Sequence, residues 1–321
     1  SISNHISFGY DSNPMKLSSD EVENSENNIF MSKYNIASKY LKINSKLQTS
    51  VQIFKRKTRL SFAIKKNLYI DLDEKSNYGI YFKFNQSLGK YRYLKFDYTF
   101  IPDIFLREYD DGDYIYQYFN FIGDISYQCY FNLSKLSIKY QIPILDKNNK
   151  VTFVINNETQ YYNENFTEFD LEINGAKILF NKKLSNANYS VSYEYSIADN
   201  ITLFDGSTST SLMDRSYDEG KMRLSYSRAF RDFSIGGSLY NINRQYSSTI
   251  MEDGLHLNRK HTDKTFSVWF KFKVNKLSHK FTFSNRDRVT SSPESWVQNL
   301  KTFNRYDISY TVFFKKISFG E

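Results

Sequence analysis

Apolar and polar residues alternate along most of this chain, and the apolar positions are largely aromatic. In Leu136 to Ile142 every second residue is apolar, and Ser137, Lys139 and Gln141 occupy the positions between them. The same period of two runs through Tyr189 to Ser196, Lys221 to Ser227 and Thr265 to Phe272. A period of two places successive side chains on opposite faces of a β-strand. The chain is therefore predicted to be all-β, with strands that have one apolar and one polar face.

The connections between these strands fall into two length classes. Six are short and basic or contain Gly: 54–57, 89–90, 132–135, 182–186, 228–232 and 273–278. Seven are longer and polar: 11–27, 71–77, 102–113, 162–168, 197–219, 246–264 and 286–301. Short turns at one end and long loops at the other are the plan of a transmembrane antiparallel up-and-down β-barrel, here with about 14 strands. Two segments, 28–53 and 135–161, are too long for one strand each, which leaves the count uncertain by two.

Composition indicates which face meets lipid. The 321 residues include 27 Tyr and 28 Phe, yet the mean hydropathy is −0.58. About 14 strands enclose a lumen too wide for side chains to fill, so an inward apolar face would leave a void. With the apolar face outward, aromatic residues meet the membrane and polar residues line the lumen. For the stretch at 265–272, this places Phe266, Val268, Phe270 and Phe272 outward and Ser267, Trp269 and Lys271 inward.

Other whole-chain features narrow the class. The chain has no window of about 18 apolar residues, which excludes a membrane-spanning helix. Residue 1 is Ser, so we expect that a targeting peptide has been removed, although an artificial boundary would look the same. The single Cys129 permits neither an internal disulfide nor a thiolate zinc site. No linker divides the chain, and residues 1–321 are predicted to be one domain.

Three segments carry a resemblance to a known class of protein. The last strand, Tyr306 to Phe314, running on to Phe319, resembles the C-terminal strand by which outer-membrane proteins of Gram-negative bacteria are recognised for assembly. Gly9 to Pro14 and His256 to Phe270 are similar to the barrels of export and lipoprotein-surface-assembly systems. This resemblance implies a location in the outer membrane of a Gram-negative bacterium, with membrane lipid and the barrel-assembly machinery as partners.

The polar face supplies the candidate site residues. The formal net charge is +8, and cations outnumber acids at the positions predicted to face the lumen. Those positions are Lys33, Lys39, Arg59, Lys65, Lys83, Lys95, Asp97, Asp124, Lys139, Glu172, Glu194, Arg223, Lys271, Arg286 and Arg305. A narrow pore with low-dielectric walls concentrates such an imbalance into a field that favours anions.

Other kinds of site have less support in the sequence. His5 and Ser7 share one face of the first strand, as in outer-membrane lipid hydrolases, but alternation points both inward, away from lipid. His256 and His261 could bind a metal, although their spacing matches no standard ligand pattern. The acidic run Asp110 to Asp113 lacks the remaining ligands of a calcium loop. Nucleic-acid binding needs aromatics and cations on one face, whereas here they occupy opposite faces.

The predicted function is a non-enzymatic pore or export channel for a small or polymeric solute, with mild anion preference and no cofactor. Loops 11–27, 197–219 and 246–264 are expected to face the exterior and to fold inward as a constriction. The alternative is a plugged assembly barrel that binds a protein partner at its loops or periplasmic turns.

Overall fold

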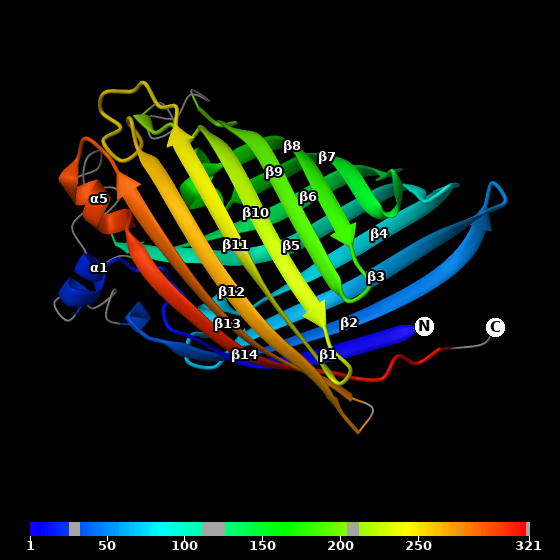
Figure 1. Ribbon diagram of the computed structural model, residues 1–321. Helices are drawn as coiled ribbons and strands as arrows, with labels where there is room; N and C mark the ends of the chain where they lie inside the picture. Colours follow the sequence, from blue (N-terminus) through cyan, green and yellow to red (C-terminus); the bar gives the residue numbers. More distant parts are fainter. Residues whose placement is uncertain (26–32, 111–125, 204–211, 276, 319–321) are drawn as a thin grey trace.

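The chain forms a closed barrel of antiparallel strands. The computed structural model describes residues 1–25, 33–110, 126–203, 212–275 and 277–318. Within them, 14 strands pair in sequence order, and β1 closes the barrel by pairing with β14 (Figure 1). The predicted fold class and strand number are therefore confirmed. No helix among these residues is long and apolar enough to cross a membrane.

The strands are mostly longer than a membrane requires, since about 9 to 11 tilted residues suffice. Their bounds are β1 Ile2–Asp11, β2 Ser38–Ile53, β3 Arg56–Tyr69, β4 Asn77–Gly89, β5 Arg92–Asp110, β6 Ser126–Ile144, β7 Asp146–Tyr162, β8 Leu171–Lys183, β9 Ala187–Asn200, β10 Tyr217–Ala229, β11 Phe233–Tyr246, β12 Lys260–Val274, β13 Leu277–Ser291 and β14 Phe303–Phe313. The extra length carries the wall beyond the membrane at one or both ends.

The two ends of the barrel differ. The connections of one to three residues after β2, β4, β6, β8, β10 and β12 all lie at the end where residue 1 and residue 318 lie, which we call the turn end (Figure 1). The opposite, loop end carries the longer connections. These include the helices α1 (Ser19–Asn24) and α5 (Ser295–Lys301) and the 3₁₀ turns η2 (Asp73–Lys75) and η3 (Glu164–Phe169).

Tight turns at the turn end require unusual backbone angles. Phe54 and Lys55 both have positive φ, as do Lys90 and Tyr91. Two consecutive residues of positive φ characterise the type I′ hairpin turn, whose twist matches that of the flanking strands. Here the side chains at the turns are cationic or aromatic, and Phe54 is 88% exposed.

Register separates the outer face from the inner face, because cross-strand partners point to the same side of a sheet. Phe266, Val268 and Phe270 lie on the outer face, opposite Leu239, Gly237 and Ile235 of β11. Trp269 and Lys271 alternate with them on the inner face, so the predicted orientation of this stretch is confirmed. Large exposed apolar residues continue around the outer face on most strands, among them Phe8, Leu47, Phe62, Phe82, Tyr98, Ile138, Phe153, Ile178, Val191, Leu224, Leu239, Phe283 and Ile308.

Two predicted boundaries around β5 and β6 are wrong. Residues 132–135, predicted as a turn, lie within β6, and the turn is at Leu145 instead. The predicted loop 102–113 begins inside β5, which continues through Pro102 to Asp110. The ladder shifts register between Ile101 and Ile104, so the proline, which has no N–H to donate, sits in a β-bulge.

The buried apolar side chains gather at the loop end. One cluster joins Met15, Leu17, Tyr34 and Leu72 of the loops to Phe105 of β5. Two further clusters lie along the same end: Cys129, Tyr162, Phe166 and Phe169, and Leu171, Ile173, Ala198, Tyr217 and Tyr246. The protein thus has its compact core in the mouth of the barrel rather than along its length.

Candidate functional site in the barrel lumen

Most of the predicted lumen positions lie on the inner face. Arg59 pairs in register with Asn85, and Asn85 with Lys95, so the three share one side of the sheet. The same reasoning places the following residues on the inner face: Arg59, Lys65, Lys83, Lys95, Asp97, Lys139, Glu194, Arg223, Lys271, Arg286 and Arg305.

Lys39 and Glu172 do not face the lumen. Lys39 lies opposite Tyr10 and on the same face as Leu41, which is the outer face. Glu172 lies opposite Thr159 on the outer face, where its carboxylate accepts a hydrogen bond from Asn157. Both residues are within two positions of the loop-end start of a strand. Outward charges are tolerated there because they lie beyond the apolar belt.

Two other predicted positions lie away from the strands. Lys33 belongs to the connection between β1 and β2, and its ammonium lies 2.6 Å from the Glu74 carboxylate at the loop end. Asp124 lies outside the residues that the structure describes, as do positions 111–113 of the acidic run.

Three cavities that share lining residues lie along the lumen within the described part of the chain. The turn-end cavity has a volume of about 660 Å³, the central cavity about 650 Å³, and the loop-end cavity about 100 Å³. Gln141 and Asn181 line both the turn-end and central cavities, and Lys135, Asn156 and Glu194 line both the central and loop-end cavities. The turn-end and central cavities are therefore similar in volume, and the loop-end cavity is much smaller.

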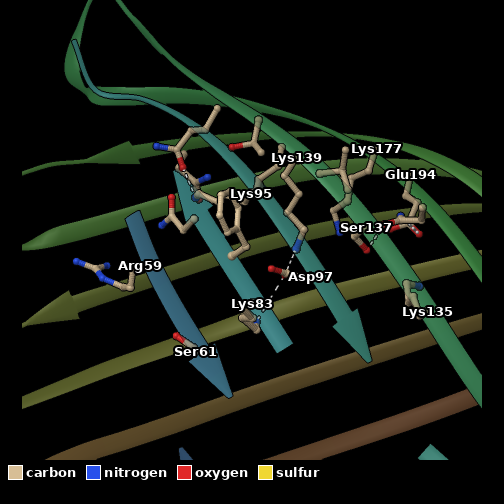
Figure 2. A pocket seen from close by; sticks show the side chains of 18 of the residues that line it. Arg59, Ser61, Lys83, Lys95, Asp97, Lys135, Ser137, Lys139, Lys177 and Glu194 are labelled. Atoms are coloured by element: carbon tan, nitrogen blue, oxygen red, sulfur yellow. Dashed lines mark hydrogen bonds and ion pairs between the residues drawn. The ribbon is translucent and has the colours of Figure 1, made fainter. Parts of the chain in front are cut away.

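The central cavity is strongly cationic. Seven cations and two acids line it: Lys46, Arg59, Lys83, Lys95, Lys135, Lys139 and Lys177, with Asp97 and Glu194. Figure 2 shows Asp97 between Lys83 and Lys139, at 3.6 and 2.6 Å. Lys95 donates to the neutral amide oxygen of Gln141 at 2.7 Å, so its charge is not compensated by that contact. Neither Arg59 nor Lys46 forms an ion pair with any described residue.

The turn-end cavity carries cations without acids. Its described lining includes Lys147, Lys150, Lys182, Lys183, Arg223 and Lys280, and no carboxylate. The remaining lining residues are mainly Ser, Asn and Gln, together with Trp269. An anion entering here meets a wall of cations and neutral hydrogen-bonding groups.

At the loop end several cations are paired with buried acids. Glu219 is 3% exposed and pairs with Lys221 at 2.6 Å and with Arg244 at 2.7 Å. The Asp263 carboxylate accepts hydrogen bonds from both Arg286 and Arg288 of β13. Asp11 and Arg305 form a bidentate pair across the β1–β14 seam. Five cations share these three carboxylates, so a smaller excess of positive charge remains here than in the other two cavities.

Several of these inner-face residues escaped sequence prediction. Lys177 and Lys221 alternate with apolar neighbours, so alternation alone could have found them. Lys135 was assigned to a turn, and its place opposite Glu158 follows only from the extended β6. Lys280 alternates with Phe281 and Phe283, so the same polar–apolar alternation could have identified it as an inner-face residue.

Loop segments meet across the mouth. Ser18 and Glu21 form a capping box that starts α1. From there Glu21 reaches Arg107 of β5 at 2.6 Å, and α1 contacts α5. Burial lowers the pKa of Lys301 on α5 to about 7, and burial lowers the pKa of Lys75 to about 8. The first of the three expected loops, residues 11–27, thus folds inward in its described part.

The alternative chemical sites find no support in the contacts. Ser7 Oγ lies 2.8 Å from Thr311 Oγ1, and the His5 ring packs against Phe313 instead. His256 Nδ1 donates to Asp253, which also holds the amide of Asp214 and so ties two loops together. His261 Nδ1 bonds to Thr290 Oγ1. Within the described residues, no three His, Cys, Asp or Glu side chains are grouped to hold a metal.

Comparisons with known proteins bear on the fold. No family model matches the chain, and a search of curated proteins found no match. Among solved structures, the outer membrane channel DcaP of Acinetobacter baumannii matches with a TM-score of 0.51 at 8% identity, covering 98% of this chain and 96% of that chain. The chain shares the fold of that protein, a closed antiparallel β-barrel. Pseudomonas aeruginosa OprD matches less well, with a TM-score of 0.42 at 9% identity, covering 99% of this chain and 96% of that one.

Proposed function

We propose that the protein is a non-enzymatic channel of the outer membrane of a Gram-negative bacterium, with the turn end in the periplasm, and that it favours anionic solutes. The observation that carries this proposal is the lining of the central and turn-end cavities. Lysine and arginine dominate there, and Asp97 and Glu194 are the acids among the described lining residues. Uncompensated charge in a confined, low-dielectric lumen raises the local concentration of counter-ions.

Reversal potential in a salt gradient tests the proposal. The purified, detergent-folded protein is inserted into a planar bilayer, and the current is recorded with different KCl concentrations on the two sides. We expect stepwise conductance with a reversal potential on the chloride side. A reversal potential on the potassium side would refute the anion preference while leaving the channel.

One observation favours a second function, a barrel plugged until a partner opens it. Leu17, Tyr34 and Leu72 are buried against Phe105 at the loop end, where apolar packing closes space that a permanently open pore would leave to water. If the correctly folded wild-type protein shows no conductance and a variant without residues 15–24 does conduct, this function is favoured over a constitutive pore.

A further inference from the structure

The turn-end cavity combines three features that a simple anion filter does not need. It has the volume of a ligand site, about 660 Å³. It also holds an aromatic ring and a row of hydroxyl groups beside its cations. The volume indicates the size of a ligand, and the ring and the hydroxyl groups indicate its chemical groups.

The aromatic feature is Trp269, whose ring lies against the backbone of β11. A Cβ built on Gly236 would lie 2.5 Å from Cζ2 of this ring, so only glycine lets the indole lie flat along the wall. The ammonium of Lys280 lies 5.3 Å from the ring centroid. Both residues line the cavity. A flat aromatic face beside a cation suits a pyranose ring that carries a carboxylate: the C–H face of the sugar packs on the indole, and the carboxylate meets the ammonium.

The hydroxyl feature is a row of serines across five strands. Ser190, Ser225, Ser238, Ser267 and Ser284 are successive register partners from β9 to β13. The first four line the turn-end cavity. The step from Ser190 to Ser267 crosses three strand spacings, about 14 Å, which accommodates a short chain of sugar rings.

Three of these five hydroxyls have no side-chain hydrogen-bond partner among the described residues. Ser267 bonds to Ser284 at 2.8 Å, whereas no side-chain hydrogen bond joins Ser190, Ser225 or Ser238 to another described residue. A hydroxyl both donates and accepts, so the row matches the hydroxyl groups of a saccharide. Serine is also small and leaves the lumen open along this wall.

The cations flank the row. Arg223 is two residues from Ser225 on β10 and so shares its face, and Lys150 lies at the end of the same register row, opposite Asn181. Lys280 lies beyond Trp269 on β13. Positive charge therefore borders the hydroxyl row at several points along its length rather than at a single spot.

We propose that the turn-end cavity binds a short acidic oligosaccharide, with a sugar ring on Trp269, its carboxylates at Lys280 and Arg223, and its hydroxyls along the serine row. This inference rests on the proposed anion channel and names its class of solute. A small inorganic anion would use the cations alone and would leave the indole and the hydroxyl row unused.

Fluorescence titration of the folded protein in detergent tests binding without reference to conductance. The chain has two Trp, and Trp296 on α5 is 52% exposed. Trp296→Phe therefore leaves Trp269 as the single reporter. The probes are a hyaluronan hexasaccharide, which carries one carboxylate per disaccharide, the neutral maltohexaose, and a hexa-aspartate peptide.

We expect saturable fluorescence change with the acidic hexasaccharide at concentrations at least tenfold below those needed for the other two probes. Equal binding of maltohexaose would overturn the role of charge, and equal binding of hexa-aspartate would overturn the role of the sugar. Lack of change with any probe would overturn the site itself. In each case an anion-side reversal potential would leave the proposed channel intact.

Matched variants locate the site. Lys280→Gln should weaken binding of the acidic hexasaccharide several-fold. The control is Lys65→Gln, because Lys65 lies 3.9 Å above the Tyr81 ring on the inner face and thus forms a similar cation–aromatic pair outside the turn-end cavity. Equal effects of the two variants would mean that general lumen charge, rather than this cavity, binds the probe.

Discussion

The two halves of the lumen use the same residue types for different purposes. Towards the turn end, Arg59, Arg223 and Lys280 face cavities with few acids or none. Towards the loop end, Arg244 and Arg288 are held by Glu219 and Asp263, which are each 3% exposed. A cation without a partner in a wide, wet lumen produces field, whereas a cation paired with a buried acid stabilises structure. The partner, rather than the basic residue, therefore decides the role.

The largest expected effect is a loss of stability at the loop end, where buried acids hold the cations. Asp263→Asn leaves Arg286 and Arg288 without their shared carboxylate, and we expect a loss of roughly 2–3 kcal/mol in the free energy of unfolding. Urea unfolding in lipid vesicles measures it. The matched change Asp97→Asn should cost less than about 1 kcal/mol, because Asp97 is 18% exposed and its partners Lys83 and Lys139 are 55% and 29% exposed. Similar losses for both variants would contradict the division between the halves.

The apolar cluster of the loop end gives the next effect. Leu17→Ala removes a side chain that is 5% exposed, and we expect a cost of about 2 kcal/mol together with more frequent open events in single-channel records. Leu145→Ala is the control, because Leu145 is 99% exposed at a turn. An unchanged open probability for Leu17→Ala would mean that this cluster does not restrict the pore.

The next effect is a change of ion selectivity when charges in the turn-end cavity are reversed. In Arg223→Glu with Lys280→Glu, two acids enter a cavity that has none among its described lining residues. We expect the chloride-to-potassium permeability ratio to fall by about tenfold, the lower range of electrostatic focusing. Reversal potentials measure the ratio. Arg244→Gln at the loop end should leave the ratio within about twofold, and the opposite ranking of the two variants would refute the assignment.

The most local effect is a pH dependence of the loop end. Burial lowers the pKa of Lys301 from its usual 10.5 to about 7. The unfolded state therefore binds this proton more tightly, and the packing around α5 gains stability as pH rises from about 7 towards 10.5 and loses it as pH falls. Hydrogen exchange of α5, corrected for the intrinsic rate, should show protection rising by no more than about tenfold per pH unit. Lys301→Met should abolish the rise, and a rise that persists would assign it to another group.

Local alternation was sufficient for much of this architecture. The period of two at Phe266 to Phe272 identified the outer face correctly, since lipid and lumen impose opposite polarity on neighbouring residues. It failed near strand ends, where Lys39 and Glu172 lie beyond the apolar belt and polarity no longer reports facing. It also failed at Pro102, because a bulge preserves a strand that the proline would otherwise end.

The contacts that divide the lumen could not be predicted. Asp263 meets Arg286 and Arg288 across strands, and Glu21 reaches Arg107 over 86 residues of sequence. Such pairings depend on register and on loop paths, which a single sequence leaves open. The packing of Leu17 and Tyr34 on Phe105 is non-local in the same sense.

The most direct test of the axial difference is the reversal potential measured with the salt gradient applied in both directions across uniformly oriented channels. Screening extends about 30 Å at 0.01 M salt but only about 3 Å at 1 M, so the half facing dilute salt dominates selectivity. We expect a stronger chloride preference when the dilute solution bathes the turn end than when it bathes the loop end. Equal preference in the two directions would contradict it.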